Sequence, residues 1–130
     1  MQTHDREPIV LAHRLKQARL RASLSQEKLG KLAGIDPMSA SARMNQYERG
    51  KHSPDYKLMC KVAEILQMPV SWFYTEDDEQ ARLQEIFFHM RPANRRPLLA
   101  EAESIFALNP PDKVAVAPAV EAASKPEADK

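Results

Sequence analysis

Residues 24–50, LSQEKLGKLAGIDPMSASARMNQYERG, are the part of the chain that decides its fold. Ser25 is a typical N-cap, because its hydroxyl can accept a hydrogen bond from a backbone N–H in the first turn of a helix. A helix is therefore expected over residues 26–33, and Gly34 can close it by adopting the left-handed conformation. A second helix is expected to follow and to end at Gly50. The stretch predicts two short helices joined by a turn.

Three residues of this stretch are suited to fixing the angle between the two helices. Gly30 is expected where the helices cross closely, since a glycine inside a helix otherwise costs about 1 kcal/mol relative to alanine. Ile35 and Met44 are expected to pack inward on either side of the turn. The second helix would then present short polar side chains outward, of a size that suits the major groove of DNA. This arrangement is the layout of a helix-turn-helix motif.

The sequence around this motif is also helical in character. Apolar residues recur at helical spacing over residues 10–22 and 55–66. Residues 69–74 are dense in aromatics and are expected to form a short fifth helix that closes the core. The chain has only three glycines, and helix-forming residue types are abundant. The expected fold class is therefore all-α, with a five-helix domain in the first 75 residues.

The chain beyond residue 75 has a different character. Apolar residues at helical spacing mark two amphipathic helices, one that breaks at Arg91-Pro92 and one that Asn94 would cap. The two would form a helical hairpin, whose apolar faces need a further surface to cover them. Residues 109–130 contain four prolines and no large aromatic, and we expect them to form a disordered tail.

The net charge of +1 conceals an uneven distribution. Residues 1–68 hold twelve Lys or Arg and seven Asp or Glu, a balance of +5, whereas residues 69–130 hold seven and eleven, a balance of −4. A basic N-terminal half is typical of a domain that binds a polyanion. No apolar run approaches the ~20 residues that span a bilayer, and the start of the chain lacks the apolar core of a secretory signal. Cys60 is the single cysteine, so no internal disulfide can form, as is typical of proteins in a reducing compartment. The protein is therefore expected to be cytoplasmic.

Several stretches, taken in order, resemble the Cro/phage-repressor-like helix-turn-helix family, often called XRE-type. Residues 24–34 read LSQEKLGKLAG, residues 47–51 read YERGK, and a helix with the expected leucine spacing follows over residues 54–66. Residues 68–74, MPVSWFY, are similar to the helix that closes the domain in that family. The resemblance covers about residues 10–75 and implies a DNA-binding domain there.

The chain is therefore expected to consist of four parts. Residues 1–9 are expected to be a flexible N-terminus and residues 10–75 the DNA-binding domain. Residues 76–108 are expected to hold C-terminal helices that serve dimerisation, because repressor-type proteins bind paired half-sites one helical turn apart. They are followed by the tail, residues 109–130.

By the same resemblance, one group of residues would hold the DNA backbone. Gln26, at the start of the first helix of the motif, would contact a phosphate together with the backbone N–H groups of that helix. Lys51 and His52 follow the second helix and would also meet phosphates, which adds affinity without sequence specificity. Arg19 and Glu48 occupy the positions of an ion pair that, in relatives, locks the first helix of the domain to the second helix of the motif.

A second group would read the bases. The residues on the face of the second helix that meets the groove would be Ser41, Arg43, Asn45 and Gln46. Arg43 can pair with guanine, and Asn45 or Gln46 with adenine, each contact being worth roughly 1–3 kcal/mol of discrimination.

The sequence departs from the family between Ile35 and Met44. Relatives have four residues between the matching positions, whereas this chain has eight. Four extra residues are about one α-helical turn. Either the turn is longer or the second helix begins one turn early, and the register of Ser39 and Ser41 depends on which.

These observations predict a dimeric, sequence-specific regulator that binds an inverted-repeat operator in double-stranded DNA, with repression as the expected effect. An alternative is an antitoxin-like or adaptor protein, whose C-terminal helices or tail bind a protein partner. An enzyme is not expected, because no nucleophile–base arrangement or phosphate-binding glycine loop is present. No cofactor and no metal are expected, since the four histidines and Cys60 lack ligand spacing.

Overall fold

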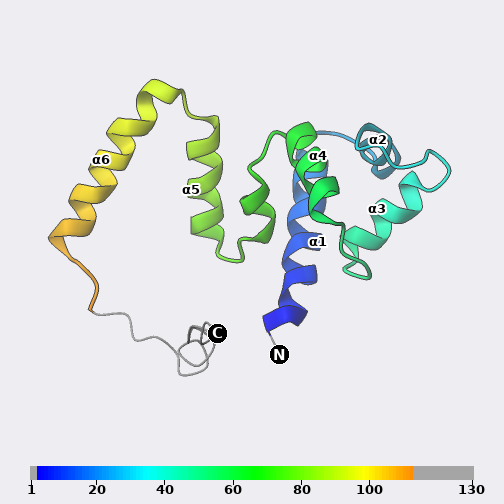
Figure 1. The fold of residues 1–130 in the computed structure, drawn as a ribbon, viewed down its shortest axis with the longest axis horizontal. Helices are drawn as coiled ribbons and strands as arrows, with labels where there is room; N and C mark the ends of the chain where they lie inside the picture. Colours follow the sequence, from blue (N-terminus) through cyan, green and yellow to red (C-terminus); the bar gives the residue numbers. More distant parts are fainter. Residues whose placement is uncertain (1–2, 113–130) are drawn as a thin grey trace, which may run out of the picture. The chain divides into compact units, whose positions relative to one another are not determined.

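The computed structural model describes the backbone of residues 3–112 and the side chains of residues 9–112, and this part of the chain contains helices and no strand. The elements, in order, are α1 (Thr3–Arg21), α2 (Gln26–Leu32), α3 (Ala40–Glu48), α4 (Tyr56–Leu66), the 3-10 helix η1 (Val70–Tyr74), α5 (Asp78–His89) and α6 (Pro92–Leu108) (Figure 1). The all-α fold class is thereby confirmed. The chain divides into two compact units, one ending at Met90 and one starting at Arg91.

The helix boundaries follow from local capping. The hydroxyl of Ser25 accepts a hydrogen bond from the Lys28 N–H, and the carboxylates of Asp55 and Asp77 do the same at the starts of α4 and α5. Gly34 has a φ of +91°, as expected for a residue that closes a helix in the left-handed region. The expected cap at Ser25 and the closing glycine Gly34 are confirmed.

One helix start differs from the expectation. α1 begins at Thr3, although the apolar periodicity that predicted a helix begins only near Val10. The segment from Thr3 to Ile9 is helical without carrying the repeating apolar stripe that a core-facing helix shows. Sequence periodicity reports which face of a helix is buried, and it is silent where a helix extends beyond the core.

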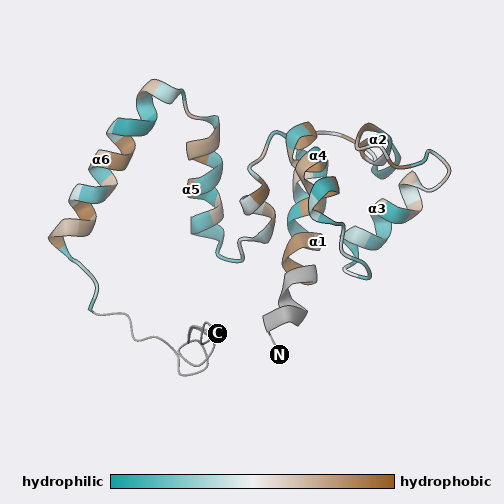
Figure 2. Cartoon of the chain, in the orientation of Figure 1, coloured by the Kyte–Doolittle hydropathy of each residue, from teal (hydrophilic) through white to brown (hydrophobic). Residues whose placement is uncertain are grey.

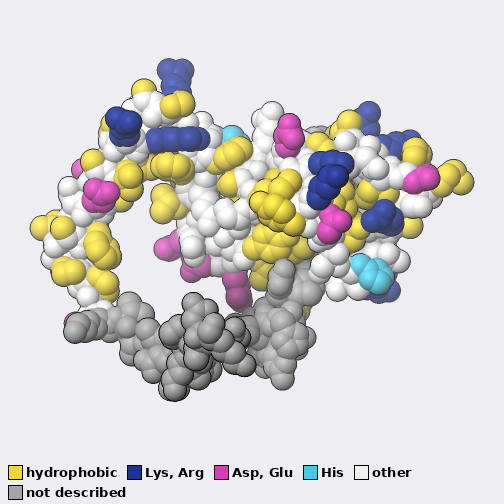
Figure 3. Space-filling model, in the orientation of Figure 1, with side chains coloured by type: hydrophobic (Ala, Val, Ile, Leu, Met, Phe, Trp, Pro, Cys, Tyr) yellow, Lys and Arg dark blue, Asp and Glu magenta, His cyan; other side chains and the backbone are white. Residues whose placement is uncertain are grey.

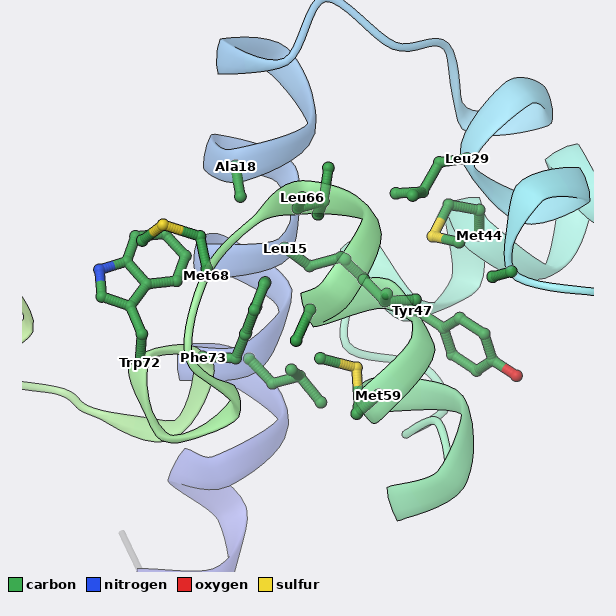
Figure 4. Packing of buried hydrophobic residues seen from close by; sticks show 14 of the residues in the cluster. Leu15, Ala18, Leu29, Met44, Tyr47, Met59, Leu66, Met68, Trp72 and Phe73 are labelled. Atoms are coloured by element: carbon green, nitrogen blue, oxygen red, sulfur yellow. The ribbon is translucent and has the colours of Figure 1, made fainter. Parts of the chain in front are cut away.

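The core of the first unit gathers side chains from each of its first five elements (Figure 4). α1 supplies Leu11, Leu15 and Ala18, α2 supplies Leu29, and α3 supplies Met44 and Tyr47; Met59, Val62 and Leu66 of α4 and Trp72 and Phe73 of η1 complete it. The rings of Trp72 and Phe73 meet edge to face, with centroids 5.0 Å apart. Full burial of these side chains fixes α3 to the rest of the unit.

A buried arginine joins α1 to the segment that leads into α5. Arg14 is only 4% exposed. Its guanidinium donates hydrogen bonds to the carbonyl oxygens of Thr75 (2.9 and 3.1 Å) and Glu76 (3.3 Å), and it pairs with the Asp78 carboxylate at 3.0 Å. The guanidinium also lies 5.3 Å from the centroid of the Trp72 ring. These contacts satisfy a charge that would otherwise be costly to bury.

α5 packs on the other elements of the first unit. Ala81 is 1% exposed, and the His89 ring nitrogen Nε2 lies 2.7 Å from the Gln67 carbonyl oxygen. The expected DNA-binding domain ended at residue 75, and the compact unit extends through Met90.

α6 is different, because none of its residues is buried. It begins at Pro92, with Arg91 rather than Asn94 at the capping position, and Pro97 lies within it. Residues 113–130, which make up most of the expected disordered tail, lie outside the described part of the chain. No helix of the described part is long and apolar enough to cross a membrane.

Candidate nucleic-acid interface

The crossing of α2 and α3 is as close as the sequence predicted. A Cβ atom placed on Gly30 would lie 2.9 Å from the Ala40 Cβ and 3.0 Å from the Ala40 carbonyl oxygen. Real Cβ atoms do not approach other atoms so closely, so only glycine fits at this position. Ala40 is fully buried at the first position of α3. The Gly30–Ala40 contact therefore sets how α3 leaves the turn.

The extra residues before Met44 lie in the turn. α3 begins at Ala40, so the connection after α2 is longer and the helix does not begin a turn early. The Asp36 carboxylate accepts a hydrogen bond from the Met38 N–H at 2.9 Å, and the Asp36 carbonyl accepts one from the Ser39 N–H at 2.9 Å. These bonds give the long turn a defined conformation.

α3 has one buried face and one exposed face. Ala40, Met44 and Tyr47 are buried. The exposed side chains are those of Ser41, Ala42, Arg43, Gln46 and Arg49, while that of Asn45 is half-buried. Figure 2 shows the hydrophilic colouring of α3. A helix with these short polar and basic groups on its free face has the size and the donors that the major groove accepts.

Two of the residues predicted to read bases lie on opposite flanks of this face. At 100° per residue, Ala42, Gln46 and Arg49 follow the middle of the exposed face, with Ser41 on one side and Arg43 on the other. The sequence analysis did not single out Ala42 or Arg49. Their spacing from Gln46, four residues before and three after, was the available signal.

Arg43 is held against its own helix. Its Nη2 donates a hydrogen bond to the Tyr47 hydroxyl at 2.8 Å, and its guanidinium carbon lies 5.9 Å from the centre of the Tyr47 ring. The Tyr47 ring packs at the edge of the core with its hydroxyl directed away from the cluster (Figure 4). The phenol thus anchors one of the predicted base-reading groups.

Asn45 is part of a polar network that braces α3. Gln26 Nε2 lies 3.3 Å from both Asn45 Oδ1 and Glu48 Oε1 and donates to them. Glu48 in turn forms a bidentate pair with Arg19, at 2.6 and 2.9 Å, and Arg19 also donates to the Leu24 carbonyl at 2.8 Å. The side chains of Arg19 and Glu48 are only 10% and 2% exposed. The hydrogen bond to Glu48 raises the pKa of Arg19 above its usual value, so the pair remains charged.

The predicted phosphate contacts stand at the two ends of the motif. Gln26 is the first residue of α2, and it is half-buried. Lys51 and His52 follow α3 and are both exposed. Figure 3 shows Lys and Arg side chains, with Asp and Glu side chains among them, over the part of the molecule that α2, α3 and α4 form. Basic side chains on this surface can pair with the phosphates of a polyanion.

Comparison with known proteins identifies the arrangement. Residues 15–73 match the family described as helix-turn-helix. Among solved structures, the chain is similar to the crystal structure of the transcriptional regulator BswR, with 42% sequence identity and a TM-score of 0.71; the match covers 75% of this chain and 96% of that one. No curated protein matches the chain. With its close helix crossing, its braced second helix and this likeness, the chain belongs to the Cro/phage-repressor type of the helix-turn-helix family and is a DNA-binding transcription regulator.

Proposed function

We propose that this regulator acts as a dimeric repressor, which recognises an inverted repeat by inserting α3 of each protomer into the major groove. The observation that carries the proposal is the division of α3 into a buried apolar face and an exposed polar face. The buried residues Met44 and Tyr47 hold the helix, and the network around Glu48 braces it. The exposed face is left to read base edges.

The contacts of Asn45 favour Gln46 as the reader of adenine. A bidentate pair with adenine uses both the oxygen and the nitrogen of a side-chain amide. The Asn45 oxygen already accepts a hydrogen bond from Gln26, whereas Gln46 is exposed near the middle of the free face. We assign base contacts to Ser41, Arg43 and Gln46, and a single-atom contact to Asn45.

Gln26, Lys51 and His52 are assigned to the phosphates. Lys51 and His52 are exposed immediately after α3, where side chains can reach the backbone beside the groove. Gln26 braces α3 through Asn45 and Glu48 and stands at the N-terminus of α2, whose backbone N–H groups favour an anion. These contacts fix the position of the protein on the duplex.

Dimerisation is assigned to the C-terminal helices. Four large apolar side chains of α6, Leu99, Ile105, Phe106 and Leu108, are 54–79% exposed, and no residue of this 17-residue helix is buried. Figure 2 shows hydrophobic and hydrophilic residues alternating along α6. An isolated helix of this length is marginal in water, so covering these apolar side chains with a second copy would stabilise it.

The reading surface can be tested by selecting bound sequences from random DNA with the full chain. A palindromic consensus is expected for the wild-type protein. The Arg43→Ala/Gln46→Ala variant should lose specific binding while its circular dichroism and melting temperature stay close to wild type, because both side chains are exposed. Recovery of the same consensus with this variant would contradict the assignment.

The dimer can be tested by measuring molar mass in solution. Leu99→Glu/Phe106→Glu should convert a dimer to a monomer and weaken binding to the palindrome far more than binding to one half-site. Glu101→Gln/Glu103→Gln, on the same helix, is the matched control. A wild-type monomer that copurifies with a stoichiometric partner protein would instead favour the adaptor function. Repression itself predicts that a reporter preceded by the selected palindrome is expressed less when the protein is present.

A further inference from the structure

One exposed apolar side chain stands directly before the helix that we propose reads DNA. Met38 is 93% exposed, which makes it the most exposed large hydrophobic residue of the described chain. It lies in the long turn between α2 and α3, two residues before Ala40 begins α3. Single exposed apolar residues are common on protein surfaces, so exposure alone assigns nothing. The inference rests on how the backbone of Met38 is held and on the position of Met38 at the start of α3.

The turn that carries Met38 is held at both ends. Ile35, before it, is 5% exposed and donates its N–H to the Gly30 carbonyl at 2.9 Å. Ala40, after it, is fully buried against Gly30. Between them, the Asp36 carboxylate accepts the Met38 N–H itself. The backbone of Met38 is therefore positioned in advance, and ordering it on binding costs little entropy.

Met38 lies at the N-terminal end of the exposed face of α3. A turn leads into the helix, in which the Ser39 N–H donates to the Asp36 carbonyl, and Ser39 is the N-cap residue of α3 with αR backbone angles. Within α3, Ala42 and Gln46 are four residues apart and share one side of the helix. Both Ala42 and Gln46 are exposed. The N-terminal end of the reading face is thus apolar, whereas its remainder is polar.

We infer that Met38, with the neighbouring Ala42 methyl, reads the C5-methyl group of thymine in the major groove. The N-terminal residues of a recognition helix are those that contact base edges, and thymine is the base that presents a methyl group there. The extra residues before Met44 thereby extend the reading face by one apolar position. This inference rests on the proposed insertion of α3 into the major groove.

The test combines a change in the protein with a change of one methyl group in the DNA. After the consensus has been selected with the wild-type chain, each of its thymines is replaced in turn by deoxyuridine, which lacks only the C5-methyl group. At one thymine of each half-site, the replacement should weaken wild-type binding about three- to fivefold, the effect of removing one buried methyl group. For Met38→Ala the same replacement should have almost no effect, while Met38→Leu should retain most of the sensitivity.

Control measurements distinguish a failure of the Met38 contact from a failure of the proposed DNA reading by α3. Leu20→Ala, which shortens a 57%-exposed leucine on α1, should leave the response to deoxyuridine unchanged. The salt dependence of binding should be the same for Met38→Ala and wild type, because no charge is lost. If Gln46→Ala relaxes the consensus at one position but Met38→Ala responds to every deoxyuridine as the wild type does, the Met38 contact is wrong and the reading by α3 stands. If Gln46→Ala keeps the consensus, the reading by α3 is itself wrong.

Discussion

The Tyr47 hydroxyl accepts a hydrogen bond from the guanidinium of Arg43 one turn earlier in α3, across 2.8 Å. Tyr47 is 7% exposed, so its ring belongs to the core while its oxygen reaches the surface. Tyr47→Phe keeps the ring and removes that oxygen. We expect a change in unfolding free energy within about 1 kcal/mol and a two- to tenfold, order-of-magnitude loss of affinity for the selected site. Binding titrations should show the loss at sites with the preferred guanine and little loss at sites without it.

The pair of Arg19 and Glu48 provides a prediction for stability. Arg19→Met leaves the Glu48 carboxylate buried without its charged partner, and should destabilise the fold by about 3–5 kcal/mol in urea unfolding. Arg19→Met/Glu48→Leu removes both charges and should cost less than the sum of the two single variants. Additive single effects would show that the two charges act independently.

Gly30→Ala tests the close helix crossing. Alanine is the better helix former by about 1 kcal/mol, which by itself would raise the melting temperature. The added Cβ meets Ala40 at 2.9 Å, however, and overpacking of this kind typically costs about 1–3 kcal/mol. We therefore expect a lower melting temperature together with weaker sequence discrimination, because α3 must shift. Lys31→Ala, an exposed neighbour in α2, serves as the control.

Replacing Lys51 and replacing Gln46 should have opposite effects on the salt dependence and on the sequence preference of DNA binding. Lys51→Ala removes a proposed phosphate contact, so the slope of log affinity against log salt should fall by about one and the consensus should stay the same. Gln46→Ala should leave the slope unchanged and relax the consensus at one position. A changed consensus for Lys51→Ala would place that lysine among the base contacts.

The sequence predicted the parts of this structure that depend on local chemistry. Ser25 caps α2, Gly34 closes it, and Gly30 lies at the crossing, because each residue type satisfies a requirement that acts within a few residues. The order of the motif matches led to the family, and the ion pair of Arg19 with Glu48 followed from that resemblance.

Contacts between residues far apart in the chain could not be predicted from the sequence. Nothing in the local sequence marks Arg14 as buried, and it is buried because the carbonyls of Thr75 and Glu76, more than sixty residues away, accept its hydrogen bonds. The Asn45–Gln26 bond is of the same kind, and it distinguishes two amides that the sequence treats alike. Periodicity assigns a residue to a face, and only the fold shows what that face meets.

Arg14 also has a consequence for how such a regulator measures DNA. Its contacts tie α1 to the residues that enter α5, which lies in the same compact unit as α3. In a dimer that used α5 as its contact, the distance between the two α3 helices would then be set by the packing within each protomer. If the proposed dimer forms in this way, we expect replacement of Arg14 to weaken the preference for one operator spacing.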